Sequence, residues 1–128
     1  MRVARSLLAF ALVGSLAGCI TYKSDERGLT YLRIGETKTV GGPRVTPLRV
    51  ISDSRCPATV QCVWAGEVRI AARIELGSGA ETRELVMGQP ASVADGTLEL
   101  VETYPERKPD QKIYPDEYLF GFRFSGGL

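Results

Sequence analysis

The sequence has no histidine among its 128 residues. Imidazole is the general base of Ser-His-Asp and Cys-His sites and the commonest zinc and copper ligand, so its absence excludes those sites. An excess of basic charge is missing too, because the sequence has 16 Lys and Arg residues against 15 Asp and Glu residues. The basic residues do not cluster beside aromatic residues. Neither a basic nucleic-acid surface nor a D-x-D-x-D-G calcium loop is present. We therefore expect no metal, no cofactor and no nucleic-acid partner.

Helical periodicity is missing as well, since no segment beyond the first twenty residues sustains it for three turns. The patterns alternate with period two instead. The clearest is residues 67–76, where every second position is apolar: Val68, Ile70, Ala72, Ile74 and Leu76. Such alternation predicts a strand with one buried and one solvated face.

Five further segments have the character of short strands: residues 38–40, 45–51, 82–87, 97–102 and 118–124. Turn signals or a proline-rich loop separate them, at residues 41–43, 77–79, 95–96 and 104–115. Pro47 cannot donate a ladder hydrogen bond, which predicts an edge or a bulge there. Aromatic residues at 118, 120, 122 and 124 share one face and are predicted to be core. Six to seven strands predict an all-β fold, a small antiparallel β-sandwich or barrel-like domain.

The N-terminus combines a basic segment with an apolar run over residues 7–13. This pattern is typical of a secretory signal and is too short to span a bilayer. The following Leu16-Ala17-Gly18-Cys19 resembles the lipobox of bacterial lipoproteins, in which the cysteine is acylated and becomes the first mature residue. The resemblance implies lipidation at Cys19 and anchoring to the cell envelope. Ile20, where an aspartate would favour the inner membrane, favours the periplasmic face of the outer membrane; the alternative is an ordinary secretory signal.

Cleavage after residue 18 would leave 110 residues, enough for one domain. It would remove two arginines and leave 14 basic against 15 acidic side chains, a net charge of −1. Residues 19–28 are polar and aperiodic, and we expect a lipidated N-terminus and tether there. Residues 29–128 then form the β-rich domain.

The two remaining cysteines, Cys56 and Cys62, are separated by five residues. In an oxidising compartment this spacing predicts a disulfide that closes a loop between two strands. A thiol copper site with Met87 is the alternative, but it needs both cysteines kept reduced and distant residues brought together.

Other residues of the same stretch form a candidate binding surface: Asp53, Arg55, Trp64 and Glu67. Arg55 has Asp53 and Glu67 as candidate carboxylate partners for its guanidinium fork. Trp64 is expected to pack over the disulfide or to cap the core, with its indole N–H bonded. The simpler interpretation is that all of these residues only shape the loop.

The pattern D-S-R-C-P-x4-C-x-W-A-G, which begins at Asp53, resembles an uncharacterised family of small proteobacterial envelope lipoproteins. Similarity extends to residues 46–48, to residues 94–98 and to the closing Phe-Arg-Phe at 122–124. The resemblance implies an envelope location and a disulfide but no activity.

Three classes of function remain. The first is a non-catalytic interaction module that acts through the closed loop, for example as an inhibitor of an envelope hydrolase. The second is a structural envelope-maintenance lipoprotein with no small-molecule ligand. The third is an enzyme with a carboxylate pair, Asp53/Glu67 or Asp116/Glu117. We expect the first, and we expect no enzymatic activity, because a salt bridge to Arg55 explains Asp53 more simply.

Overall fold

The structure of the protein is a computed structural model that describes Gly14, residues 27–57, residues 59–63 and residues 66–126. Apart from Gly14, the expected signal peptide lies outside the described residues, as do Cys19 and Trp64. The elements along the chain are β1 (Thr30–Leu32), β2 (Lys38–Thr39), β3 (Arg44–Asp53), β4 (Val68–Leu76), β5 (Gly79–Val86), β6 (Ala91–Val93), β7 (Gly96–Tyr104), the 3₁₀ turn η1 (Pro115–Glu117) and β8 (Leu119–Gly126). Across these described ranges, no helix is long and apolar enough to cross a membrane.

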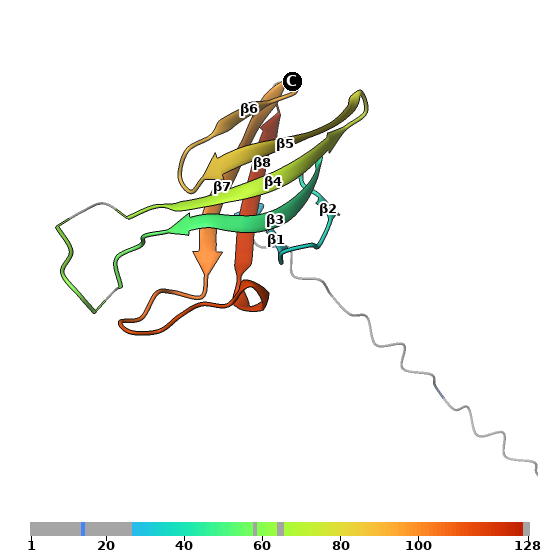
Figure 1. Cartoon of the computed structure of the whole chain (residues 1–128). Helices are drawn as coiled ribbons and strands as arrows, with labels where there is room; N and C mark the ends of the chain where they lie inside the picture. The colour runs from blue at the N-terminus through green and yellow to red at the C-terminus, as the bar shows by residue number, and fades with distance from the viewer. Residues whose placement is uncertain (1–13, 15–26, 58, 64–65, 127–128) are drawn as a thin grey trace, which may run out of the picture.

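The strands form two four-stranded antiparallel sheets that pack face to face (Figure 1). One sheet has the order β1-β8-β7-β6, and the other has the order β2-β3-β4-β5. The predicted all-β fold is therefore confirmed, and it takes the sandwich form. The described residues contain eight strands rather than the six or seven expected. The two that were not predicted, β1 and β6, are only three residues long. A segment that short is too brief to show alternation in the sequence.

The core lies between the sheets. Strand β4 contributes one face to it, of which Leu76 at the end of the strand is only partly buried. Val68, Ile70, Ala72 and Ile74 are fully buried, as their alternation predicts. Each fully buried branched side chain stabilises the fold by roughly 1.5–3 kcal/mol. Ala71, on the opposite face, is also buried.

The aromatic stripe of β8 completes the core. Tyr118, Phe120 and Phe122 are buried, and their rings follow one another at centroid distances of 5.6 and 6.4 Å. Phe124 is partly buried at the end of the strand. The prediction that this stripe is core is confirmed.

Strand β3 carries the chain from one end of the sandwich to the other. Its register with β4 shifts between Pro47 and Arg49, so the bulge predicted at Pro47 is present. The short β2 pairs only with Arg44 and Val45. Beyond that point the only strand that pairs with β3 among the described residues is β4, and β3 leads into the disulfide-closed loop.

The first described residues of the predicted tether are attached to the sandwich. The Arg27 guanidinium forms an ion pair with Glu102 of β7, with 2.9 Å between Nη2 and Oε1. Arg27 also donates a hydrogen bond to the Tyr31 hydroxyl at 2.9 Å. The end of the predicted tether therefore contacts the domain that begins two residues later.

Candidate functional site

Residues 54–67 connect β3 to β4, and the described parts of this loop, residues 54–57, 59–63 and 66–67, project from one end of the sandwich (Figure 1). Its two ends are joined at the base, because the Ser54 amide donates to the Glu67 carbonyl at 2.9 Å and the Glu67 amide donates to the Ser54 hydroxyl at 3.0 Å. Gly66 passes so close that a Cβ there would lie 2.2 Å from the Ser54 carbonyl oxygen. Only glycine permits this approach of the two backbones.

A second closure lies farther out in the loop. Cys56 and Cys62 form a disulfide, with 6.0 Å between their Cα atoms, so the predicted pairing is confirmed. Within it, the Val60 amide donates to the Pro57 carbonyl at 3.0 Å and forms a turn. The loop is therefore closed covalently as well as by backbone hydrogen bonds.

The base of the loop contains a nearly buried ion pair between Asp53 and Arg55. Arg55 donates from Nε to Asp53 Oδ1 at 2.9 Å and from Nη2 to Oδ2 at 2.8 Å. This is the bidentate geometry in which guanidinium–carboxylate pairs are strongest. The Asp53 side chain is 8% exposed and the Arg55 side chain 13%. These two residues lie beneath the surface, so they position the loop and present little area to a partner.

The same ion pair connects the loop to the connector between β7 and β8, residues 105–118. Arg55 also donates to the carbonyl oxygens of Thr103 and Pro105, at 2.9 and 3.0 Å. From the connector, the Tyr118 hydroxyl donates to Asp53 Oδ2 at 2.9 Å, and Arg107 donates to the Asp53 backbone oxygen at 2.5 Å. These contacts fix the base of the loop against a segment about fifty residues away in the chain.

The electrostatics of the site favour a charged Asp53 and a neutral Tyr118. Burial by itself raises the pKa of the Asp53 carboxyl, but the hydrogen bonds and charge of Arg55 and the hydrogen bond from Tyr118 outweigh it and lower that pKa. Burial, followed by the hydrogen bond to Asp53, raises the pKa of Tyr118 to about 12. Both shifts hold the Tyr118–Asp53–Arg55 arrangement in one protonation state near neutral pH.

Glu67, the other predicted partner of Arg55, lies elsewhere. Its carboxylate is paired with Arg69 at 3.4 Å. Arg55 and Asp53 are close in the chain and both contact the connector, whereas Glu67 lies immediately before β4. The Asp53 and Glu67 carboxylates thus bind different arginines rather than facing each other as a catalytic pair. In the second pair that the sequence offers, Glu117 accepts a hydrogen bond from the Tyr114 amide at 2.7 Å.

The alternative of a thiol copper site is contradicted, because both cysteines are in the disulfide. Met87 packs against the core instead. In the portion of the chain that the structure covers, no group of three or more cysteine or carboxylate side chains could hold a metal ion.

Exposed apolar side chains gather at the same end of the sandwich, a feature that sequence reasoning missed. The large hydrophobic residues exposed in the described ranges come from β3, the loop that follows it, the last residue of β7 and the connector: Leu48, Ile51, Val60, Val63, Tyr104 and Tyr114. Val63 is 99% exposed and Val60 45%. A groove of about 550 Å³ lies between β3 and the connector. The sequence signal available was weak, namely two valines among the small or polar residues of 56–63.

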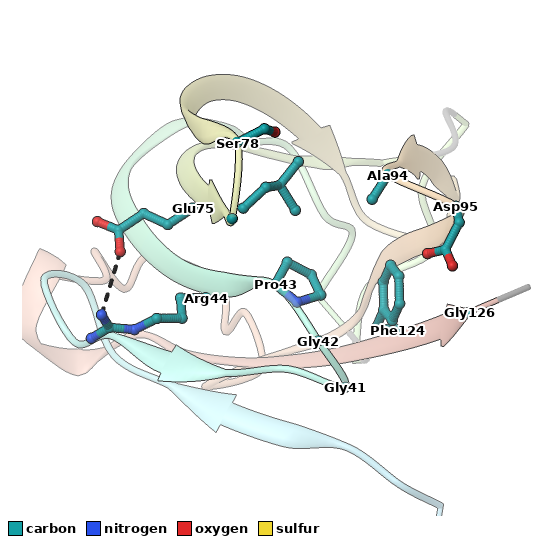
Figure 2. Close-up of a pocket in the computed structure, with 12 residues that line it drawn as sticks. Gly41, Gly42, Pro43, Arg44, Glu75, Ser78, Ala94, Asp95, Phe124 and Gly126 are labelled. Atoms are coloured by element: carbon teal, nitrogen blue, oxygen red, sulfur yellow. Dashed lines mark ion pairs between the residues drawn. The ribbon is translucent and has the colours of Figure 1, made fainter.

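A larger pocket lies at the opposite end of the sandwich, where the hairpin turns meet the end of β8. It measures about 820 Å³ (Figure 2). Of the residues predicted as a binding surface, the three that the structure describes, Asp53, Arg55 and Glu67, do not line it.

Comparison of the chain with protein-family models, with curated proteins and with solved structures finds no match. The interpretation of both ends of the sandwich therefore depends on their own contacts, burial and charge.

Proposed function

We propose that this protein is a bacterial envelope lipoprotein whose disulfide-closed loop is a non-catalytic binding module for another envelope protein. The proposal places a lipid on Cys19 and the domain at the periplasmic face of the outer membrane, as the N-terminal sequence indicates. The observation that carries it is the exposed apolar surface of the loop: Val60, 45% exposed, lies inside the segment closed by the disulfide, and Val63, 99% exposed, directly follows Cys62.

The loop has the stiffness that a recognition element needs. Association costs free energy for every side chain and backbone segment that becomes ordered, so a segment that is already fixed binds more tightly for the same contacts. Here the disulfide, the hydrogen bonds at the base and the Asp53–Arg55 pair fix the loop before any partner arrives. A loop whose only purpose was to connect β3 to β4 would need none of these.

The chemistry of the tip indicates the kind of partner. Residues 56–63 contain no charged side chain, and the exposed apolar residues of β3 and the connector lie at the same end. A projecting neutral loop with an apolar base fits a cleft with apolar walls. Inhibition of an envelope hydrolase by insertion of the loop into its cleft is the specific form of the proposal.

Crosslinking in intact cells tests the proposal. A photoreactive amino acid replaces Val63, and in a matched control it replaces Glu81, an exposed residue of β5 outside both the loop and the pocket lining. We expect a discrete protein adduct from position 63 and none from position 81. The adduct should disappear when Val60 is changed to Asp, because a charge would then have to be desolvated.

Equal adducts from both positions, or none from position 63, would count against the binding module. With no adduct, a structural envelope-maintenance role becomes the better interpretation. The anchor is tested separately: metabolic labelling with a fatty acid should mark the wild-type protein but not Cys19→Ser.

A further inference from the structure

The pocket opposite the closed loop is built from three hairpin turns and the end of β8. Its walls are residues 41–44, residues 75–78, residues 94–95, Phe124 and Gly126. The volume of about 820 Å³ lies within the range of roughly 300–1,000 Å³ that is usual for ligand sites. In Figure 2, Phe124 and Asp95 lie on one side of the pocket, the Glu75–Arg44 ion pair lies on the other, and Pro43 lies between them.

Glycines line this pocket and leave it open. Backbone geometry requires glycine at only one of the three positions considered below. Gly41 has a φ of +63°, and a Cβ there would lie 3.0 Å from Phe124 Cβ, so glycine is required. Gly42 and Gly77 have no left-handed φ. A Cβ at Gly42 would make an ordinary contact of 3.6 Å with Phe124, and a Cβ at Gly77 would meet nothing within 4 Å. At these two positions the absence of a side chain leaves space in the pocket that a ligand can occupy.

The β6–β7 turn adds a strained residue and an unengaged carboxylate. Ala94 has a φ of +52° in a two-residue turn, a position where glycine is preferred. Strain of this kind persists most often at functional sites. The turn places Asp95 at the rim of the pocket, where it is exposed and forms no hydrogen bond or ion pair with another residue in the described ranges.

The remaining lining combines apolar surface with groups that donate and accept hydrogen bonds. Phe124, Pro43 and Leu76 supply the apolar surface. Arg44 and Glu75, 3.6 Å apart, together offer N–H donors and carboxylate acceptors at the rim. With Asp95 added, the lining carries two carboxylates and one guanidinium, a composition that disfavours an anionic ligand.

We propose that this pocket is a binding site for a neutral saccharide. A sugar ring has an apolar C–H face that packs on an aromatic or proline ring, and it has hydroxyl groups that both donate and accept hydrogen bonds. Phe124 and Pro43 match the first property, and the Arg44, Glu75 and Asp95 side chains match the second. The pocket is separate from the closed loop, so this proposal does not depend on the proposed interaction module.

Titration of the isotope-labelled full chain tests the site by NMR. The probes are three neutral tetrasaccharides (maltotetraose, cellotetraose and tetra-N-acetylchitotetraose) and one anionic one (tetragalacturonate). Gly77→Leu fills the pocket from a position with free space around it. Ala80→Leu is the matched control, since it adds the same side chain to the same hairpin outside the pocket lining. Asp95→Asn removes the free carboxylate charge without a change of shape.

We expect at least one neutral tetrasaccharide to shift the amide signals of Gly42 and Gly77 saturably. Gly77→Leu and Asp95→Asn should each weaken that binding by about tenfold or more, whereas Ala80→Leu should leave it unchanged. Three results would overturn the proposal. The first is no saturable binding by any neutral probe, and the second is tighter binding of tetragalacturonate than of the neutral probes. The third is wild-type affinity for the neutral probe in both Asp95→Asn and a folded Gly77→Leu.

Discussion

Replacing Arg55 with methionine removes a guanidinium that makes four hydrogen bonds at the base of the closed loop. Two go to the Asp53 carboxylate, one goes to the Thr103 carbonyl near the end of β7, and one goes to the Pro105 carbonyl at the start of the connector. Methionine retains most of the aliphatic stem but cannot donate. The substitution therefore leaves Asp53, whose side chain is 8% exposed, with the Tyr118 hydroxyl as its remaining side-chain donor.

The magnitude follows from that burial. Removal of one partner of a fully buried ion pair costs about 3–5 kcal/mol, because the other charge stays desolvated. Arg55 is 13% exposed, so some water reaches the pair. We therefore expect a loss near the lower limit, about 3 kcal/mol in the free energy of unfolding. For a domain of about 100 residues, this corresponds to a fall in Tm of at least about 12 °C.

Urea denaturation of a double-mutant cycle measures the effect. The cycle contains Arg55→Met, Asp53→Asn and the double variant, and we expect a coupling energy of about 2 kcal/mol because the two side chains share hydrogen bonds. Arg69→Met is the matched control. Arg69 also contacts two carboxylates, Glu67 and Glu84, but its side chain is 37% exposed, so little change is expected.

Equal losses for Arg55→Met and Arg69→Met would refute the reasoning, since burial would then make no difference. Additive effects of the Asp53 and Arg55 substitutions would refute it as well, because the two groups would not be energetically coupled.

Further predictions concern pH, the disulfide and the loop base. Burial raises the pKa of Tyr118 to about 12 in the folded chain, compared with about 10 in an unfolded chain. The contribution of Tyr118 to the free energy of unfolding should therefore be fully present below about pH 10 and decrease as the pH rises towards 12. Tyr118→Phe should remove that decrease in alkaline urea titrations. The pKa of Asp53 is lowered in the folded chain, so the contribution of its carboxylate to the free energy of unfolding should be lost as the pH falls below about 4. In Asp53→Asn the free energy of unfolding should therefore change less over that acid range in the same titrations. Cys56→Ser/Cys62→Ser should lower the free energy of unfolding by about 2.4 kcal/mol, the chain-entropy value for a seven-residue loop; an unchanged urea midpoint would contradict this. In thermal melts Gly66→Ala should be strongly destabilising, because its Cβ would lie 2.2 Å from a backbone oxygen.

The sequence alone determined features that depend on neighbouring residues. The alternation in β4 identified its buried face, because a strand turns successive side chains to opposite sides whatever lies around it. The disulfide followed from two cysteines close enough in the chain to meet. The strands β1 and β6 were missed, because three residues are too few to show alternation. These two segments are strands because they pair with β8 and β7 in the folded sheet.

Only the tertiary structure decided what the chemically active side chains do. Arg55 had two candidate carboxylates in the sequence, and the packing of the connector against β3 selected Asp53 and added carbonyl acceptors about fifty residues away. The same packing buried Asp53 and Arg55 and left Val60 and Val63 at the surface. The pocket with Asp95 and Phe124 arises from turns that are far apart in the chain. Contacts between distant segments depend on how two sheets stack and where their ends meet, and no local pattern of residues encodes that geometry.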